Sequence, residues 1–215
     1  MKKYFVTYGD DKFADTIKRI ILEAKKTNEF DVIRSYSSKD VSPEVKESPL
    51  FSIKRGGGLW SWKPDIILLI LKEMDIGDFL IYCDAGCSLY RSTEWEKYWN
   101  ILKEHDIIAS RIYQSTFKWT RREIIDFFHS NEKNWIKSPM FMATVLFLKK
   151  SNFIIHFMEE WRSIMIENPK LVMDVNEDEK HYQLKKFREN RHDQAVFSGD
   201  RNLNSVQKQF TLHYG

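Results

Sequence analysis

The segment from Gly56 to Tyr90 reads GGGLWSWKPDIILLILKEMDIGDFLIYCDAGCSLY, and the rest of the chain is arranged around it. Lys63-Pro64 follows a glycine run and two tryptophans, and it opens a strongly apolar stretch. Proline fits the first turn of a helix, where its missing N–H leaves no bond unmade. The pattern therefore predicts a buried helix from Asp65 to Met74.

A short buried strand, Phe79 to Cys83, follows this helix and ends on Asp84-Ala85-Gly86. A carboxylate at the carboxyl end of a buried strand, followed by small residues, lets a ligand and a metal ion approach the backbone closely. Asp84 is therefore the first candidate for an active-site residue. The other interpretation is that Asp84 only forms a turn.

Strands and helices alternate on both sides of this segment. Near the start, a strand–helix–strand unit of this length points to parallel strands joined by a right-handed crossover. The fold class is therefore α/β, with one mixed, mostly parallel sheet flanked by helices. The expected strands are Tyr4–Tyr8, Phe30–Ser35, Ile107–Tyr113 and Met140–Leu148. The expected helices are Phe13–Ala24, Thr93–Glu104, Thr120–His129, Phe153–Ile166 and Glu179–Glu189, and Asp193–Phe197 is expected to form a short helix or a turn.

Two local signals are more detailed. Thr120 and Glu123 have the spacing of a capping box, in which the threonine hydroxyl caps the helix. Thr93 is the expected cap of the helix that follows it. The polar stretch from Tyr36 to Arg55 contains two prolines and predicts a long loop with at most one short helix.

The totals limit the class of protein. The 215 residues carry 34 basic and 31 acidic side chains, a formal charge of +3, and no basic block that would indicate nucleic-acid binding. The cysteines, Cys83 and Cys87, form no disulfide framework and read as reduced thiols of a cytoplasmic protein. A zinc site from C-x3-C alone lacks two ligands.

The longest apolar run, Ile66 to Leu71, is far shorter than the ~20 residues that cross a bilayer. We therefore expect no transmembrane segment and no secretory signal. This leaves room for peripheral contact with the inner face of a membrane.

Three polar features, far apart in sequence, could form one site. They are the Asp84 turn, the run Arg191-His192-Asp193-Gln194 and His213 near the end. A strand-end carboxylate and a histidine can bind a divalent cation that bridges a diphosphate. Lys63 and Arg55 could neutralise phosphate charge. The simpler interpretations remain open: Asp193 as a helix cap, Lys63 as a solvated residue and Trp60 and Trp62 as packing.

These residues resemble a known family. The order of elements and motifs is similar to that of GT-A-fold nucleotide-sugar glycosyltransferases. This order is strand, helix, strand, then W-S-W-K-P, then G-D-F-L-I-Y-C-D-A-G, and then a late H-D-Q. Bacterial lipopolysaccharide and capsule transferases, and related retaining galactosyl- and mannosyltransferases, are most similar. The resemblance covers nearly the whole chain. It implies a single GT-A-like (Rossmann-like) domain, with a nucleotide-binding half of about 1–113 and an acceptor-side half of about 114–215.

The resemblance also implies roles for individual residues. Thr7, Tyr8, Lys63, Asp84, Ala85 and Gly86 would bind the nucleotide part of a UDP-sugar. Asp193 and Gln194 would act at the sugar, and Asp84 with His213 would hold Mn²⁺ or Mg²⁺. Trp119–Arg122 and Met140–Thr144 are candidates for the side that binds a glycan or glycolipid acceptor. The sequence departs from the family where Gly86 replaces the second carboxylate of the D-x-D metal motif.

The implied reaction is retaining, divalent-metal-dependent transfer of a hexose to a hydroxyl. Without the metal, Lys63, Arg55 or Arg191 would have to stabilise the leaving diphosphate. Because one carboxylate is missing, the alternative is a catalytically weak protein that binds a nucleotide sugar or a partner. A nucleotidyltransferase would need a glycine-rich loop after the first strand, where only Gly9 is available. All three polar features are expected to meet in one pocket.

Overall fold

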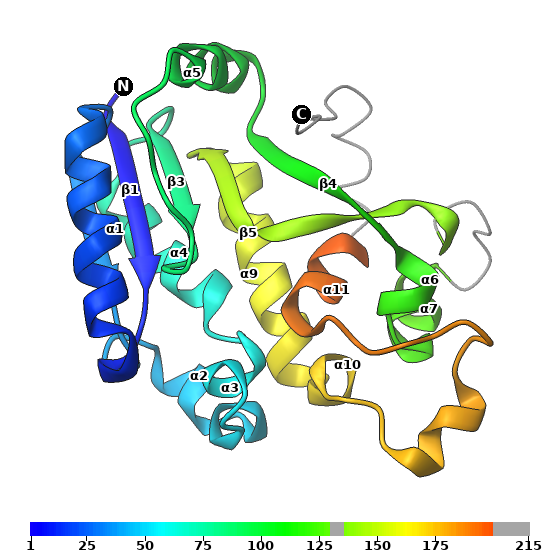
Figure 1. The fold of residues 1–215 in the computed structure, drawn as a ribbon. Coiled ribbons are helices and arrows are strands. Elements are labelled where there is room, and N and C mark those ends of the chain that lie inside the picture. The colour runs from blue at the N-terminus through cyan, green and yellow to red at the C-terminus, as the bar shows by residue number, and fades with distance from the viewer. Residues whose placement is uncertain (130–135, 200–215) are drawn as a thin grey trace. The chain divides into compact units, whose positions relative to one another are not determined.

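The structure is a computed structural model that describes residues 1–129 and 136–199 (Figure 1). The predicted metal ligand His213 lies outside the described residues. The chain forms two units, each assembled from three separate segments. The first unit comprises Met1–Ser42, Pro64–Ala109 and Thr144–Glu159, and the second Pro43–Lys63, Ser110–Ala143 and Glu160–Gly215.

The sheet begins with three parallel strands in the first unit. β1 (Lys3–Tyr8) lies between β2 (Val32–Tyr36) and β3 (Phe79–Cys83). Every residue of β3 is buried, which fits its unbroken apolar sequence. β5 (Pro139–Lys149) pairs with β3 in the antiparallel direction, and β4 (Ile107–Ser115) completes the order β2-β1-β3-β5-β4. The predicted α/β class with a mixed, mostly parallel sheet flanked by helices is confirmed.

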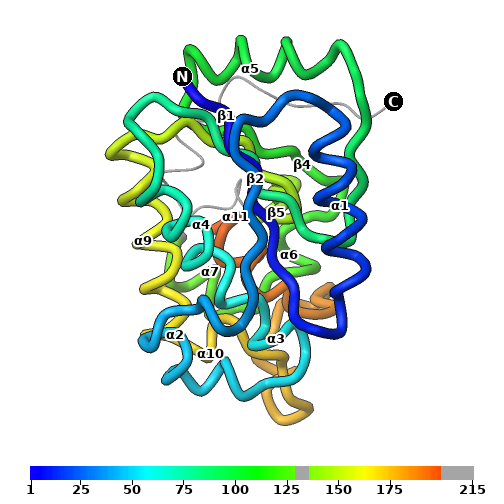
Figure 2. Tube along the Cα trace, turned by 90° about the vertical axis from the view of Figure 1, so that its left-hand side faces the viewer, coloured from blue at the N-terminus to red at the C-terminus, as the bar shows by residue number. Residues whose placement is uncertain are grey.

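Helices cover the strands of the first unit. α1 (Ala14–Thr27) follows the short 3-10 turn η1 (Asp11–Phe13) and lies along β1 in two views (Figures 1 and 2). It ends at Asn28, whose left-handed conformation closes the helix. α4 (Lys63–Glu73) begins with Pro64 in its first turn, as predicted. α9 (Asn152–Glu167) agrees with the helix predicted from its apolar spacing.

Aromatic rings pack where α5 (Glu94–Glu104) lies near the amino end of β1 (Figures 1 and 2). The rings of Trp95 and Trp99 stack at 5.9 Å, and Trp99 stacks on Phe79 at 5.8 Å. Phe30 meets both tryptophans edge-on. These rings belong to the core, which accounts for part of the high aromatic content.

Short helices make up much of the second unit. Trp161 is buried against Phe197, with ring centroids 4.9 Å apart. α11 packs against α7 and α10 (Figure 1). The elements are α2 (Pro43–Glu47), η2 (Pro49–Ser52), α3 (Gly56–Leu59), α6 (Thr116–Trp119), α7 (Arg122–His129), α10 (Pro169–Val172), η3 (Glu177–Tyr182) and α11 (His192–Gly199).

Several local predictions are wrong. The 36–55 stretch holds two short helical elements, α2 and η2, instead of at most one. The predicted helix Glu179–Glu189 is only the end of η3, followed by non-helical chain. Thr93 makes no capping hydrogen bond, because the hydroxyl of Ser92 accepts from the Glu94 N–H instead.

The capping box at Thr120 is also wrong. The buried Thr120 hydroxyl has no hydrogen-bond partner among the described residues. Glu123 instead receives two hydrogen bonds from Arg121, whose side chain is almost fully buried. Burial alone would raise the pKa of Glu123, but hydrogen bonds from Arg121, its own backbone N–H and Gln183 lower it to about 2. The Glu123 carboxylate is therefore engaged by the Arg121 guanidinium in a charge-assisted pair, and the Thr120 hydroxyl caps no helix.

Candidate functional site

Asp84 follows β3 directly and is half-buried. Its backbone N–H donates to the Thr144 carbonyl at 2.9 Å, and its carbonyl accepts from the Cys87 N–H at 3.0 Å. Its carboxylate accepts a short hydrogen bond from the hydroxyl of the fully buried Tyr82. The backbone and one carboxylate oxygen are therefore fixed, while the side chain keeps access to solvent.

The turn after Asp84 is tied to α1 by Arg19. Its guanidinium donates to the carbonyls of Ala85 at 2.9 Å and Cys87 at 2.8 Å, and to the Ser88 hydroxyl at 2.9 Å. Glu23 pairs with Arg19 at 2.8 Å and accepts from the Leu89 N–H at 3.0 Å. One arginine therefore fixes the loop that carries the predicted site residues. The position of Arg19 on α1 shows no sequence pattern from which its contact with this loop could have been predicted.

The strand ends bring Thr7 and Tyr8 together with Asp84. β1 and β3 are paired in register up to Val6 and Tyr82, so two further residues bring Tyr8 level with Asp84. Thr7 is fully buried, and its hydroxyl has no hydrogen-bond partner among the described residues. Burial and nearby Asp10, which accepts from the Tyr8 hydroxyl at 3.3 Å, raise the pKa of Tyr8. This edge offers an uncharged phenol and the carboxylates of Asp84 and Asp10.

The described residues do not fit a metal centre by themselves. Within 1–129 and 136–199, no group of three histidine, cysteine, aspartate or glutamate side chains could hold an ion. Asp84 supplies one carboxylate, and that carboxylate already accepts from Tyr82. A hydrogen bond with the Cys87 thiol, together with burial, raises the pKa of the Cys83 thiol well above its usual value. A protonated thiol is a poor metal ligand.

In the second unit, Lys63 and Asp193 form a buried ion pair. The Lys63 Nζ lies 2.8 Å from the Asp193 Oδ2, and the two side chains are 3% and 6% exposed. Lys63 also donates to the Ala143 carbonyl at 3.2 Å, while the Gln194 Oε1 accepts from the Ala143 N–H at 3.4 Å. Lys63 is therefore not the solvated helix-start residue that the sequence left open.

The packing around Asp193 supports this arrangement. The Trp161 indole donates to the Asp193 carbonyl at 3.2 Å. Removing two charges from water is costly, and a buried ion pair usually gives little net stability in return. Such a pair at the start of α11 is therefore a candidate functional feature rather than a device for folding.

The other predicted cations are already paired. Arg55 donates to both oxygens of Asp174, at 3.1 and 3.3 Å. Arg191 pairs with Glu189 at 3.1 Å and lies over the Trp119 ring at 4.4 Å. Neutralising a diphosphate with either arginine would therefore require an existing ion pair to be exchanged.

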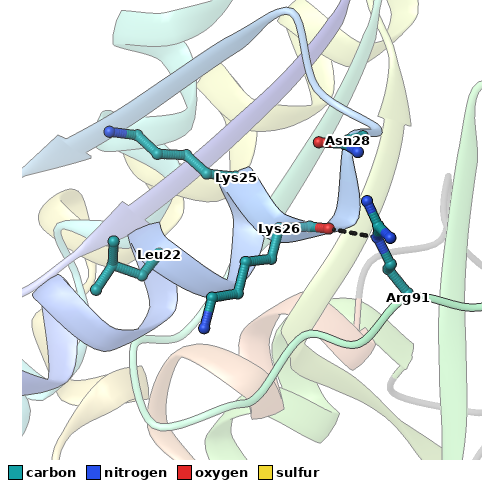
Figure 3. Close-up of a pocket in the computed structure, with 5 residues that line it drawn as sticks. All are labelled: Leu22, Lys25, Lys26, Asn28 and Arg91. Atoms are coloured by element: carbon teal, nitrogen blue, oxygen red, sulfur yellow. Dashed lines mark hydrogen bonds between the residues drawn. The ribbon is translucent and has the colours of Figure 1, made fainter.

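An open cavity of about 600 Å³ lies at the carboxyl end of α1 (Figure 3). Arg91 donates from Nε to the Lys26 carbonyl at 2.8 Å, which ties the loop before α5 to the end of α1. Lysines near a helix carboxyl end interact favourably with its dipole, which accounts for their position. None of the predicted site residues lines the cavity, whose lining is Leu22, Lys25, Lys26, Asn28 and Arg91.

No protein-family model matches the chain, and no curated protein matches it in sequence. Among the helices of 1–129 and 136–199, none combines the length and hydropathy of a membrane span.

Several solved structures are similar to the chain. The galactosyltransferase LgtC, in complex with donor and acceptor sugar analogs, matches at 13% identity over 91% of this chain and 69% of its own, with a TM-score of 0.44. A glycosyltransferase involved in glycosylation of the major capsid of PBCV-1 matches at 12% over 99% and 82%, with a TM-score of 0.42. Mouse xyloside xylosyltransferase 1 (apo form) matches at 15% over 92% and 80%, with a TM-score of 0.46. All three are glycosyltransferases, the class that the sequence resembles.

Proposed function

We propose that the chain is a glycosyltransferase that moves a hexose from a UDP-sugar to a hydroxyl of a glycan acceptor, such as lipopolysaccharide or capsule. The single observation that carries the proposal is the buried pair of Lys63 and Asp193, with the Gln194 amide next to it. A carboxylate paired with a buried lysine provides a fixed dipole in a region from which water is excluded. Such preorganised groups stabilise charge that develops in a transition state.

In this mechanism the bond between the sugar C1 and the β-phosphate oxygen breaks. Positive charge develops on the sugar ring and negative charge on the departing UDP. The acceptor hydroxyl bonds to C1 through its oxygen and gives its proton to the departing β-phosphate oxygen. Asp193 and Gln194 orient the sugar and stabilise its positive charge, while Lys63 holds the Asp193 carboxylate in place. Retention of the anomeric configuration is part of the proposal.

Nucleotide binding is assigned to the strand ends of the first unit. The proposed contacts are Thr7, Tyr8 and the turn Asp84-Ala85-Gly86. The buried Thr7 hydroxyl supports this, because a buried polar group without a partner is costly and a ligand atom would satisfy it. We also propose that the chain binds a glycan acceptor and makes peripheral contact with the inner face of a membrane.

Dependence on Mn²⁺ or Mg²⁺ is also proposed, with Asp84 and His213 as the protein ligands. A bound divalent cation would neutralise negative charge on the departing diphosphate. Since the described residues do not form a metal centre on their own, the assay must include chelator and metal arms.

The test is release of UDP from a panel of UDP-hexoses by the full chain, with and without Mn²⁺. We expect slow release by hydrolysis in the absence of acceptor. Asp193→Asn should lower kcat at least 100-fold while the affinity for UDP changes little. Asp65→Asn is the matched control, because Asp65 is also a buried carboxylate, paired with Ser42 by two hydrogen bonds.

The second candidate is a nucleotide-sugar-binding protein without turnover. Gly86, where a second carboxylate is usual in the similar family, favours it. The same assay separates the two functions: donor affinity without UDP release under any metal condition would support the binding protein and contradict the transferase.

A further inference from the structure

Five consecutive residues before Lys63 have left-handed backbone conformations. The φ angles of Gly56, Gly57 and Gly58 are 60°, 57° and 103°, and those of Leu59 and Trp60 are 54° and 60°. The Leu59 N–H donates to the Arg55 carbonyl at 2.9 Å and the Trp60 N–H to the Gly56 carbonyl at 3.3 Å. The segment is a left-handed helical turn. Glycine adopts this conformation freely, but residues with a Cβ seldom do.

Two of the three glycines have close neighbours on the side where a Cβ would lie. A Cβ on Gly58 would lie 3.0 Å from the Phe51 Cα, and one on Gly56 would lie 2.6 Å from the Trp60 ring. The Trp62 indole donates to the Gly56 carbonyl at 2.9 Å, which closes the turn from the other side. Gly56 and Gly58 therefore suit this turn, whereas Leu59 and Trp60 adopt the same conformation despite their Cβ atoms.

His192 also has a left-handed conformation, with φ of 47°. Its ring stacks on that of Trp60, with centroids 5.6 Å apart and planes 28° apart. The His192 Nδ1 lies 2.8 Å from the Val172 carbonyl, a hydrogen bond that fixes the ring. The ring is almost fully buried.

Each stacked residue closely precedes one member of the buried ion pair. The Lys63 N–H donates to the Trp60 carbonyl at 3.0 Å, and His192 is bonded directly to Asp193. A return of either residue to the right-handed region would redirect the chain that carries the charged side chain. Catalytic groups displaced by about 1 Å already lose much of their effect.

We propose that Trp60 and His192 are positioning residues: their stacked rings hold two left-handed turns together and thereby place Lys63 against Asp193. The positioning of the ion pair stands on geometry alone, and only its catalytic consequence rests on the proposed function. Backbone outliers that the surroundings hold in place are typical of functional sites.

Two substitutions of Trp60 separate the ring from the backbone. Trp60→Ala removes the ring and keeps a Cβ that disfavours φ of 60°, whereas Trp60→Gly removes the same ring and accepts that φ. The readout is the acetylation rate of Lys63 by mass spectrometry, with exposed Lys12 and Lys72 as internal references. We expect a rise of at least tenfold in Trp60→Ala and a markedly smaller rise in Trp60→Gly. Trp60→Phe, which keeps a ring, should stay close to wild type.

His192 offers an independent pair. Asparagine tolerates left-handed conformations better than alanine, so His192→Asn should protect Lys63 more than His192→Ala. Trp95→Ala is the control for general loss of packing, because Trp95 belongs to an aromatic cluster of the first unit. It should lower thermal stability and leave the Lys63 acetylation rate unchanged.

Donor kinetics test the catalytic consequence. If the ion pair acts in turnover, Trp60→Ala should lower kcat at least tenfold with little change in KM. Trp60→Phe should keep a kcat close to that of wild type. Wild-type Lys63 protection in Trp60→Ala and His192→Ala would overturn the proposal. Equal loss of protection in the alanine and glycine variants would overturn the backbone role. If the variants lose protection of Lys63 from acetylation but the wild-type chain turns over no UDP-sugar, the positioning role stands and the proposed function is contradicted.

Discussion

Asp84 and Asp193 are both carboxylates that the sequence marks for chemistry, but their surroundings differ. Asp84 is half-exposed, and it follows a strand in a loop that Arg19 fastens through neutral backbone groups. Asp193 is buried, and its charge is balanced by Lys63 at 2.8 Å. An exposed carboxylate can bind a ligand directly, whereas a buried paired one contributes through its fixed field. Under the proposed function, this difference fits ligand binding by Asp84 and electrostatic stabilisation by Asp193.

The largest expected effect on stability is the loss of one partner of the buried pair. Lys63→Met or Asp193→Leu alone leaves an uncompensated buried charge, and we expect each to lower the free energy of unfolding by about 3–5 kcal/mol. The double variant, Lys63→Met with Asp193→Leu, removes both charges and should therefore recover much of this loss in stability. Urea unfolding of all four proteins measures it. A double variant no more stable than either single one would contradict the assignment of a purely electrostatic partnership.

A smaller effect should follow from loosening the Asp84 loop. Arg19→Ala removes hydrogen bonds to two carbonyls and a hydroxyl, at a partly exposed site, so we expect a loss of only about 1 kcal/mol in the free energy of unfolding. The larger change should be local: amide hydrogens of residues 85–89 should exchange at least tenfold faster. Lys18→Ala, on the exposed face of the same helix, should change neither quantity. Unchanged exchange in Arg19→Ala would show that Arg19 does not hold the loop.

Glu123 is a third carboxylate for this comparison, and its contribution to the free energy of unfolding should depend on pH. Arg121 and Gln183 hold its pKa at about 2, below its usual 4.5. A depressed pKa stabilises the fold fully above about 4.5, and this stability is lost as the pH falls toward 2. The difference in unfolding free energy between wild type and Glu123→Gln should therefore be largest at pH 6 and shrink by pH 3. A difference independent of pH would contradict the ion-pair explanation.

Much of the fold could be predicted because its signals are local. The continuous apolar run before Asp84 and the aromatic and β-branched residues of Tyr4–Tyr8 each predict a strand. The ends of these two strands form the edge where Thr7, Tyr8 and Asp84 meet. The capping prediction at Thr120 failed because the helix begins at Arg122 and the Glu123 carboxylate accepts hydrogen bonds from the neighbouring Arg121 guanidinium, which also pairs with Glu179 far along the chain.

The site could be predicted only in part. Lys63 and Asp193 were both candidates, but no local pattern pairs residues 130 positions apart, and a lysine before a helix usually reads as solvated. Nothing in the sequence showed that Leu59, Trp60 and His192 have left-handed backbone conformations. Arg19 gave no signal, because its role depends on carbonyls of a loop far along the chain.

The most direct test of the account is turnover of a UDP-hexose by wild type, Asp84→Ala and Asp193→Asn, measured beside UDP affinity. Asp84→Ala should abolish turnover and weaken UDP binding, with little effect on folding. Asp193→Asn should lose kcat at least 100-fold and bind UDP almost as wild type. Near-normal kcat in Asp193→Asn, or full activity in Asp84→Ala, would contradict the division of roles between the two carboxylates.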